Sequence, residues 1–435
     1  MIVKSAKRLR GKIRLPGDKS ISHRAVLLSA LSEGTSRISN FAASADCNST
    51  LNCLSVLGVE FEREIDQVTI TGRGKRGFIM PSAPLDCGNS GTTMRLLSGI
   101  LAGQPFESVL IGDESLSKRP MKRIIDPLTE MGAEIDSIDG HAPLTINGHS
   151  NLRPIEYRLP VASAQLKSCI LLAGLFADGE TTVVETVPTR DHTERMLRGF
   201  GVNLRSIKLP GATRISILGD SELVACDIEV PSDVSSAAFF LAAAACLDGS
   251  YVEIPDVGLN PTRAGVIDVL RRFGADIEMR DERESGGEPI GTVIVRGGSY
   301  LASSADNTVK GEIVANLIDE VPILAVFGTQ VEGGIEFRDA GELRVKESDR
   351  IASVVENLRR MGADVEEFED GLKVGKSDLA GATIDSFGDH RIAMAFAIAG
   401  LLGSGETVIE GAECAAVSFP DFFRVLDASI ERIDP

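Results

Sequence analysis

Hydrophobic residues along the chain recur in two alternating kinds of segment. The first kind joins an apolar run to a glycine and a short strand-like stretch, as in LSVLGVEF ending at Phe61 and LRRMGADV ending at Val365. An amphipathic helix that ends in a glycine C-cap and continues into a strand explains this pattern. The residue after the helix recurs six times, with an aspartate in a degraded last copy: Gly58, Gly132, Gly201, Gly274, Gly362 and Asp427.

The second kind of segment is apolar on every side and meets a glycine turn that is generally followed by alternating, β-rich residues. Such segments leave little room for a solvated face, so they predict helices that are buried all round. Six are present: RAVLLSALSEGTSRI, MRLLSGILAG, LKSCILLAGLFADGETTVV, AAFFLAAAACLDGSYVEI, VPILAVFGTQVEGGIEF and RIAMAFAIAGLLGSGETVI.

The two kinds of segment together define a repeat of a buried helix, a strand, an amphipathic helix and a second strand. Six repeats predict an α/β fold of two pseudo-symmetric domains, with three repeats in each, helices inside and sheets outside. The polar, glycine-rich stretch RDERESGGEPIG at 280–291 predicts a loop or a hairpin tip within a repeat rather than a domain boundary.

Composition narrows the classes of protein that the chain can represent. Of its 435 residues, 43% are hydrophobic and 25% charged, which is typical of a globular chain. The 45 basic and 63 acidic residues give a net charge of −18, which argues against a nucleic-acid-binding protein. No apolar run approaches the roughly 20 residues of a membrane helix. The N-terminus also lacks the apolar stretch of a secretory signal.

Cysteine and histidine usage bears on metals and on the cellular compartment. The seven cysteines include no CxxC pair, and the five histidines include no HExxH motif, so neither a metal site nor a redox centre is expected. An odd number of cysteines in mostly apolar settings indicates reduced thiols. We therefore expect a cytoplasmic protein.

The predicted buried helices begin with unusually polar turns. In PGDKSISHRA, Lys19 and His23 can share one helical face, as can Ser20 and Arg24. The other starts include DCGNSGTTMR, PVASAQLK, IDEVP and FGDHR. Helix N-termini carry unpaired N–H groups and a partial positive charge, which suit anions. Several such ends in one cleft, together with cations such as Arg391, would form a positive pocket for small, multiply charged anionic substrates.

Two further clusters carry candidate chemistry. GDESLSKRPM places Lys118 and Arg119 in a predicted loop, where they could reach a carboxylate or phosphate. In ELRVKESDR, a helical conformation would place Lys346 and Arg350 one turn apart with Glu347 beside them. That arrangement offers two anion contacts and a carboxylate able to exchange protons. An exposed, salt-bridged helix start is the alternative interpretation of this second cluster.

Nine motifs in order, from about Gly11 to Phe423, resemble the 5-enolpyruvylshikimate-3-phosphate (EPSP) synthase family. They are PGDKSISHR, GNSGTTMR, SKRPM, SAQLKS, TRDHTE, IDEVPILA, ELRVKESDR, GDHRIAMA and SFPDFF. The resemblance implies transfer of the enolpyruvyl group of phosphoenolpyruvate to the 5-hydroxyl of shikimate 3-phosphate, with release of phosphate, in the shikimate pathway that leads through chorismate to aromatic amino acids. It also implies the inverted α/β fold, these two small molecules as partners and no cofactor. With the charge and hydropathy above, we expect no nucleic acid and no membrane as partners, and a monomer.

The resemblance further implies the bounds of the two domains and which site residues each one carries. Residues 1–14 and 230–435 would form a discontinuous domain with the phosphoenolpyruvate-side residues and the proton-transfer carboxylates. Residues 15–229 would form the domain with most shikimate 3-phosphate contacts. The active site would lie in the cleft between them.

Site residues follow from the same resemblance, position by position. The catalytic residues would be Lys19, Asp319 and Glu347, with Asp319 drawing the proton from the 5-hydroxyl and Glu347 moving protons at the methylene carbon. Shikimate 3-phosphate would contact Lys19, Ser20, Arg24, Ser163, Ala164, Gln165, Arg190, Asp319 and Lys346. Phosphoenolpyruvate would contact Lys19, Gly91, Arg119, Gln165, Arg350 and Arg391. No metal ligand is implied.

A few positions depart from the better-known family pattern. Ala164 replaces a serine of many members, Glu342 replaces an asparagine, and Val417 stands before Ser418 where a lysine is typical. These features resemble a divergent bacterial branch that often carries alanine at the position of Gly91. A methyl group there would crowd the inhibitor glyphosate more than phosphoenolpyruvate, so the glycine predicts sensitivity to glyphosate.

Two alternatives compete with this interpretation. A UDP-N-acetylglucosamine enolpyruvyl transferase would share the fold, but it typically has Lys-Asn in place of Lys19-Ser20 and a loop cysteine that residues 115–121 lack. A noncatalytic anion-binding relative would be expected to have lost some of the proton-handling carboxylates and cations. Both carboxylates, Asp319 and Glu347, are present.

Overall fold

The computed structural model describes residues 1–302 and 306–432 and divides into two compact units. The first unit contains Met1–Pro16, Pro231–Arg283 and the chain from Pro289 onward. The second unit contains Gly17–Val230 together with the short segment Glu284–Glu288. Each unit has its own hydrophobic core.

Each unit contains three sheets among its described residues, and within each sheet a parallel pair of strands is extended by antiparallel strands. The second unit has the sheets β14-β3-β5-β4, β6-β7-β9-β8 and β10-β11-β13-β12. Their strands are β3 (Glu33–Ser39), β4 (Glu60–Arg63), β5 (Val68–Arg73), β6 (Leu85–Asp86), β7 (Glu107–Ile111), β8 (Glu134–Ile138), β9 (His141–Asn147), β10 (Glu156–Arg158), β11 (Glu180–Glu185), β12 (Leu204–Leu209), β13 (Ala212–Leu218) and β14 (Ile228–Glu229).

The first unit repeats this organisation. Its sheets are β1-β23-β22, β16-β17-β15-β2-β24 and β18-β19-β21-β20. Their strands are β1 (Ile2–Lys4), β2 (Ala6–Lys12), β15 (Tyr251–Gly258), β16 (Asp276–Ser285), β17 (Glu288–Arg296), β18 (Thr308–Val309), β19 (Ile335–Phe337), β20 (Val365–Phe368), β21 (Gly371–Val374), β22 (Thr383–Asp385), β23 (Glu406–Glu410) and β24 (Ile430–Arg432).

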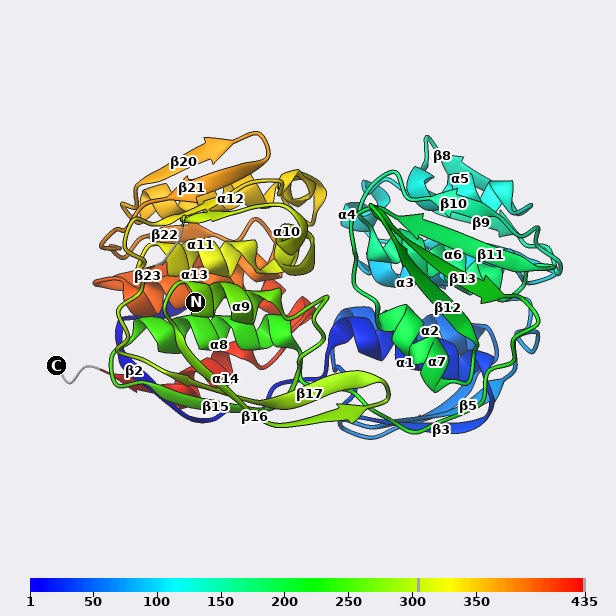
Figure 1. Cartoon of the computed structure of the whole chain (residues 1–435), viewed down its shortest axis with the longest axis horizontal. Helices are drawn as coiled ribbons and strands as arrows, with labels where there is room; N and C mark the ends of the chain where they lie inside the picture. The colour runs from blue at the N-terminus through cyan, green and yellow to red at the C-terminus, as the bar shows by residue number, and fades with distance from the viewer. Residues whose placement is uncertain (303–305, 433–435) are drawn as a thin grey trace. The chain divides into compact units, whose positions relative to one another are not determined.

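Six apolar helices form the two cores, as the sequence predicts. In α8, every residue from Val234 to Ala245 is buried, and the other five are buried along nearly their whole length. Within each unit the sheets lie outside these helices (Figure 1). The α/β architecture of three repeats in each unit is therefore confirmed. The helices are α1 (Lys19–Leu31), α3 (Gly91–Ala102) and α6 (Ala164–Gly174) in the second unit, and α8 (Val234–Cys246), α11 (Val321–Gly328) and α13 (His390–Leu402) in the first.

The second helix of each repeat is buried on one side. These helices are α2 (Ala45–Val56), α5 (Lys122–Glu130), α7 (His192–Gly199), α9 (Gly265–Arg272), α12 (Arg350–Arg360) and α14 (Phe422–Ser429). Five are followed by the predicted glycine, with φ from 82° to 105°, a conformation that glycine adopts without steric cost. The sixth position was predicted wrongly: Asp427 lies inside α14, and β24 follows the helix directly, so no left-handed residue is needed there.

The remaining elements are short. They are α4 (Glu114–Ser117), α10 (Glu312–Leu317) and three 3₁₀ turns, η1 (Ile318–Glu320), η2 (Gly341–Val345) and η3 (Ala412–Val417). The predicted hairpin tip is present, because Gly286 and Gly287 connect β16 to β17. In the described part of the chain, no helix has the length and apolarity that crossing a membrane requires.

Candidate active site

Three buried helices of the second unit present their capped N-termini among the predicted site residues. Asp18 caps α1 by accepting a hydrogen bond from the N–H of Ile21 at 2.9 Å. Ser90 caps α3, and Ser163 caps α6 through a 3.3 Å bond from the N–H of Leu166. Each predicted polar turn is therefore a helix start, and Lys19, Gly91 and Ala164 are the first residues of their helices.

Lys19 lies beside a carboxylate of the neighbouring helix. Its Nζ is 2.9 Å from Oδ2 of Asp46, in the first turn of α2, and both side chains are largely shielded from solvent. An ion pair this close fixes the direction of the ammonium group. Asp46 was not predicted from the sequence as a candidate site residue, because it lies in the first turn of an ordinary amphipathic helix and belongs to none of the recognised motifs.

Arg24 is buried and hydrogen-bonded on three sides. It donates from Nε to Oγ1 of Thr193 at 2.6 Å, from Nη2 to Oγ of Ser168 at 2.9 Å and from Nη1 to the carbonyl oxygen of Ser20 at 2.8 Å. Burial lowers the pKa of Arg24 to about 10. The neighbouring guanidinium of Arg190 also lowers it, whereas nearby carboxylates oppose the shift. Arg24 therefore stays cationic at neutral pH, and its guanidinium and that of Arg190 repel each other.

The start of α3 is surrounded by two arginines and a glutamine. Arg95 donates from Nη1 to Oε1 of Gln165 at 2.6 Å, and Gln165 donates to Oγ1 of Thr92 at 2.9 Å. Arg119 donates to Oδ1 of Asn89 at 2.7 Å from the predicted loop between α4 and α5. The structure therefore brings the predicted residues Gly91, Arg119 and Gln165 together. It adds Arg95, which the sequence places one turn into this helix without assigning it a role.

Lys118, in contrast, forms an ion pair at the surface. Its Nζ is 2.7 Å from Oε1 of Glu114, one turn earlier, and both side chains are more than 70% exposed. Such surface pairs contribute little to stability. Arg119, the other basic residue of this loop, lies beside Gly91 instead and is hydrogen-bonded to Asn89. We refer to Lys19, Arg24, Arg95, Arg119 and Gln165 as the second-unit cluster.

A buried chain of hydrogen bonds connects α1 to the cap of α3. Nδ1 of His23 is 2.7 Å from Oγ1 of Thr50, which is 2.7 Å from Oγ1 of Thr93. Thr93 in turn donates to Oγ of Ser90 at 2.7 Å, next to Gly91. Burial lowers the pKa of His23 from 6.5 to about 3, so its ring is neutral at physiological pH.

This buried histidine should make the stability of the chain depend on pH. Below pH 6.5 the unfolded chain binds a proton at His23, whereas the folded chain does not bind it until about pH 3. The free energy of unfolding therefore falls as the pH decreases. We expect His23 to account for about 2 kcal/mol of the loss in unfolding free energy between pH 7 and pH 5. Urea unfolding at both pH values should show this loss reduced in His23→Gln. The exposed His149→Gln variant should keep the wild-type loss, and equal losses in all three proteins would contradict the expectation.

In the first unit, the predicted site residues gather around Arg350, the first residue of α12. Its side chain is 1% exposed and faces three carboxylates. It donates from Nε to Oδ2 of Asp389 at 2.7 Å, from Nη1 to Oδ1 of Asp319 at 3.1 Å and from Nη2 to Oε2 of Glu347 at 2.6 Å. A single guanidinium thus holds both carboxylates that the sequence assigns to proton transfer.

Asp389 gives Arg350 its buried counter-charge. Burial acts to raise the pKa of Asp389, but Arg350, aided by His390, outweighs it and lowers that pKa below its usual value. The same carboxylate caps α13 by accepting a hydrogen bond from the N–H of Arg391 at 2.9 Å. Asp389 therefore links the position of Arg350 to the helix start that carries Arg391.

Arg391 lies near a second buried carboxylate. It donates from Nη1 to Oε1 of Glu320 at 3.2 Å and to the carbonyl oxygen of Asp319 at 3.2 Å. Glu320 is fully buried and also accepts hydrogen bonds from Arg263 and Ser235. This network was not predictable from the sequence, because Arg263 and Ser235 lie outside the recognised motifs. We refer to Asp319, Glu320, Glu347, Arg350 and Arg391 as the first-unit cluster.

The segment before Arg350 is not the helix that the sequence analysis considered. It is a 3₁₀ turn that ends at Val345, after which Lys346 has an extended backbone (φ −83°, ψ −151°) and Asp349 caps α12 through the N–H of Ala352. The considered helical arrangement, with Lys346 and Arg350 one turn apart, is therefore not present. Their side chains still meet at Asp319, since Nζ of Lys346 lies 3.8 Å from Oδ1 of that residue.

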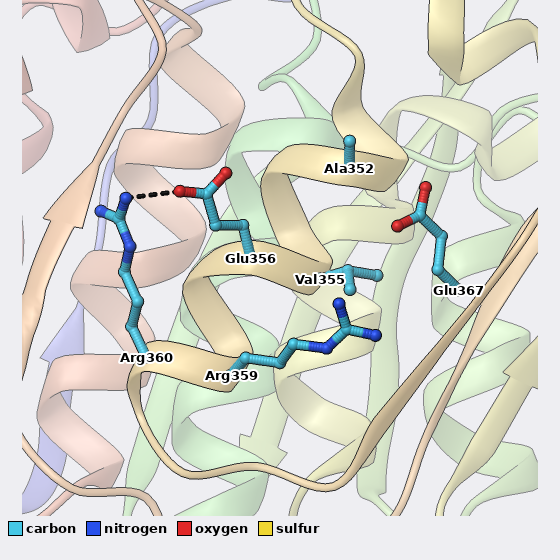
Figure 2. A pocket seen from close by; sticks show the side chains of 6 residues that line it. All are labelled: Ala352, Val355, Glu356, Arg359, Arg360 and Glu367. Carbon is cyan, nitrogen blue, oxygen red and sulfur yellow. Dashed lines mark hydrogen bonds and ion pairs between the residues drawn. The ribbon is translucent and has the colours of Figure 1, made fainter.

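A surface hollow of about 500 Å³ lies on the other side of α12 and contains none of the predicted site residues. Figure 2 shows its lining, in which Arg360 pairs with Glu356 and the guanidinium of Arg359 lies between α12 and Glu367. Glu367 also pairs with Arg344 at 3.0 Å. Because the hollow lies apart from the predicted residues, it is not the candidate active site. No group of three potential metal ligands occurs within residues 1–302 and 306–432.

The fold therefore combines a cluster of cations in one unit with paired carboxylates on a buried arginine in the other, which are groups suited to binding anions and exchanging protons. The family model for EPSP synthase (3-phosphoshikimate 1-carboxyvinyltransferase) matches residues 3–426. The chain belongs to this family.

Relatives and solved structures agree with this assignment. The 3-phosphoshikimate 1-carboxyvinyltransferase of Salinibacter ruber is 53% identical over 429 residues, covering 98% of both chains. The enzyme of the same name from Koribacter versatilis is 51% identical and covers 99% of both. The structure of EPSP synthase from Acinetobacter baumannii is similar with a TM-score of 0.88 and 45% identity, over 99% of this chain and 97% of that one.

Proposed function

We propose that the two clusters act together on phosphoenolpyruvate and shikimate 3-phosphate, the substrates of the family. The reaction joins the 5-hydroxyl of shikimate 3-phosphate to the enolpyruvyl group and releases phosphate. The observation that carries this proposal is the pair Asp319 and Glu347 on Arg350, because the reaction needs one group to take a proton from an oxygen and another to exchange protons at a carbon. The alternative acceptor UDP-N-acetylglucosamine is not favoured, since the matching family and relatives carry the EPSP synthase name.

The second-unit cluster is proposed to bind most of shikimate 3-phosphate. Arg24 and Arg190 supply adjacent positive charge for its phosphate, and Ser163 and Gln165 supply polar contacts at the start of α6. Ser20 and Ala164 line the same helix starts. Lys19 is proposed to contact both substrates, with its ammonium group directed by Asp46.

Phosphoenolpyruvate is proposed to lie near the start of α3 and to engage cations of both clusters. Gly91 leaves the N-terminus of α3 open to a phosphate group, and Arg119 and Gln165 flank it. Arg350 and Arg391 are proposed to bind the carboxylate and phosphate of this substrate, because guanidinium groups match both anions in geometry.

The proposed chemistry proceeds by addition and elimination. Asp319 accepts the proton of the 5-hydroxyl while the hydroxyl oxygen forms a bond to the central carbon of phosphoenolpyruvate. In the same step, Glu347 gives a proton to the methylene carbon. Glu347 then removes a proton from the resulting methyl group, the bond to the phosphate oxygen breaks, and phosphate leaves with the proton that Asp319 accepted. Lys346 supports Asp319, and the cations stabilise charge on the intermediate.

Phosphate release on mixing substrates tests the proposed function. Wild-type protein should release phosphate from phosphoenolpyruvate only when shikimate 3-phosphate is added. UDP-N-acetylglucosamine in its place should give no release above the background without an acceptor. Release with the sugar nucleotide would assign the chain to the alternative transferase, and no release with either acceptor would indicate the noncatalytic relative.

Gly91 should control inhibition by glyphosate. A Cβ atom at this position would lie 3.0 Å from Nη1 of Arg95 and 3.5 Å from Nη1 of Arg119, so a methyl group reduces the space beside both guanidinium groups. We expect wild-type activity to be inhibited by millimolar glyphosate and Gly91→Ala to raise the inhibition constant by about 10–200-fold. The KM for phosphoenolpyruvate should rise less. Steady-state assays check this, and an uninhibited wild-type enzyme would show the expectation to be wrong.

We also propose that the enzyme is a cytoplasmic monomer. All seven cysteines carry free thiols, which suits a reducing compartment. The residues proposed to contact the two substrates all come from one chain. Light scattering of the purified protein would detect a second copy.

A further inference from the structure

The tip of the β16–β17 hairpin contacts the second unit, although the strands of the hairpin belong largely to the first. Residues on both sides of the tip belong to the first unit, whereas Glu284–Glu288 belong by their contacts to the second. We infer that this tip positions the shikimate 3-phosphate side of the active site, with Glu288 as a positioning residue for Arg190 and Arg24. The inference rests on the binding roles proposed above for those two arginines.

The principal contact is a buried hydrogen bond between Glu288 and His192. Oε1 of Glu288 is 2.8 Å from Nδ1 of His192, and both side chains are 2% exposed. The other ring nitrogen of His192 is buried and has no hydrogen-bond partner among the described residues. Glu288 therefore supplies the bond that orients this imidazole, and its loss would leave a buried polar ring unsatisfied.

His192 begins the helix that holds Arg24 in place. The next two residues of α7 each bind another part of the unit: Oγ1 of Thr193 accepts from Nε of Arg24 at 2.6 Å, and Oε1 of Glu194 is 2.6 Å from Nζ of Lys167. Three successive side chains thus connect the hairpin tip, α1 and α6 to the first turn of α7. A shift of His192 would change the hydrogen bond that directs the Arg24 guanidinium.

A second contact ties the hairpin tip to the residue after Arg190. Arg195 donates from Nη1 to the carbonyl oxygen of Gly287 at 3.0 Å and from Nε to Oδ1 of Asp191 at 2.9 Å. On the other side of Arg190, the N–H and the hydroxyl of Thr189 both donate to Oε2 of Glu185. The loop that carries Arg190 is therefore held by β11 before it and by the hairpin tip after it.

The charge of Glu288 also reaches the proposed phosphate site. It opposes the effect of burial and raises the pKa of Arg24, and it acts in the same direction on Arg195. Glu288 is two residues from the left-handed Gly286 and follows the left-handed Gly287, whose φ is 84°. This tight turn lets the backbone approach Arg195 closely, since a Cβ atom on Gly287 would lie 3.4 Å from the carbonyl oxygen of Arg195.

Steady-state kinetics of hairpin variants test the inference. Glu288→Ala should raise the KM for shikimate 3-phosphate by about tenfold, because it removes one coupling interaction of ordinary size. The KM for phosphoenolpyruvate and kcat should stay within about twofold of wild type. Glu288→Gln keeps an oxygen that can accept the His192 hydrogen bond, so it should recover most of the affinity. Glu282→Ala, an exposed position on the same hairpin, is the matched control and should match wild type.

Kinetics of combined variants separate positioning from a general loss of structure. If Glu288 acts through His192, Glu288→Ala should add little to the KM of a His192→Ala variant. An unchanged KM for shikimate 3-phosphate in Glu288→Ala would overturn the inference, as would equal changes in both KM values and kcat. Arg190→Ala distinguishes a failure of the hairpin inference from a failure of the proposed binding role. If Arg190→Ala raises the KM for shikimate 3-phosphate while Glu288→Ala does not, only the hairpin inference fails. If Arg190→Ala also has no effect, the proposed binding role of Arg190 fails with it.

Discussion

Replacing Glu347 with glutamine should lower kcat by about 10²–10⁴-fold, the range that a positioned acid or base contributes. The carboxylate accepts a hydrogen bond from Arg350 at 2.6 Å and keeps 25% of its side chain exposed, so it is both oriented and accessible. Glutamine can accept the same hydrogen bond but cannot exchange protons at the methylene carbon. Glu347→Ala should cause a loss of similar size.

Binding and stability should change much less in this variant. Calorimetric titration should show the dissociation constant for shikimate 3-phosphate within a few-fold of wild type, because the proposed contacts to that substrate do not include Glu347. Glu356→Gln is the control, since Glu356 is an exposed glutamate on α12 that pairs with Arg360. Turnover close to wild type in Glu347→Gln would show that the assigned role of Glu347 is wrong.

Replacing Arg350 with methionine should destabilise the first unit by about 3–5 kcal/mol, because it leaves the fully buried Asp389 charged and without its partner. The same change also frees Asp319 and Glu347 from the cation that holds them, so activity should be lost with stability. Urea unfolding gives the free energy. Arg360→Met, on the exposed side of the same helix, removes only a surface pair and should cost less than about 1 kcal/mol.

A double variant identifies the cause of that loss. In Arg350→Met combined with Asp389→Asn, the uncompensated buried charge is gone while the amide oxygen can still cap α13, so part of the stability should return even though the enzyme stays inactive. If the double variant is no more stable than Arg350→Met alone, packing of the guanidinium rather than its charge explains the effect. That result would contradict the electrostatic explanation of the cluster.

Periodicity in the sequence predicted the fold well because it records burial directly. The six apolar helices have no solvated side, and five glycines mark helix ends where the backbone turns left-handed. The degraded copy at Asp427 shows the limit of the pattern. There β24 follows α14 without a turn, so the residue that aligned with the glycines lies inside the helix.

The candidate site was predictable where a single local motif carries it, and less so where side chains from distant segments meet. Lys19, Gly91 and Ala164 begin helices as their capping residues indicate. The partners Asp46, Asp389 and Glu320 could not be assigned, because no spacing relates them to Lys19, Arg350 and Arg391. In ELRVKESDR, Asp349 is a helix cap, and recognising it as one would have placed the helix start at Arg350.

The most direct test of the central claim is a crystal structure of the protein with shikimate 3-phosphate and glyphosate bound. The account predicts that one molecule of shikimate 3-phosphate contacts Lys19 and Arg24 of the second unit and Lys346 and Asp319 of the first. Each contact should be within about 3.2 Å. Contacts to this ligand from one unit alone would contradict the account.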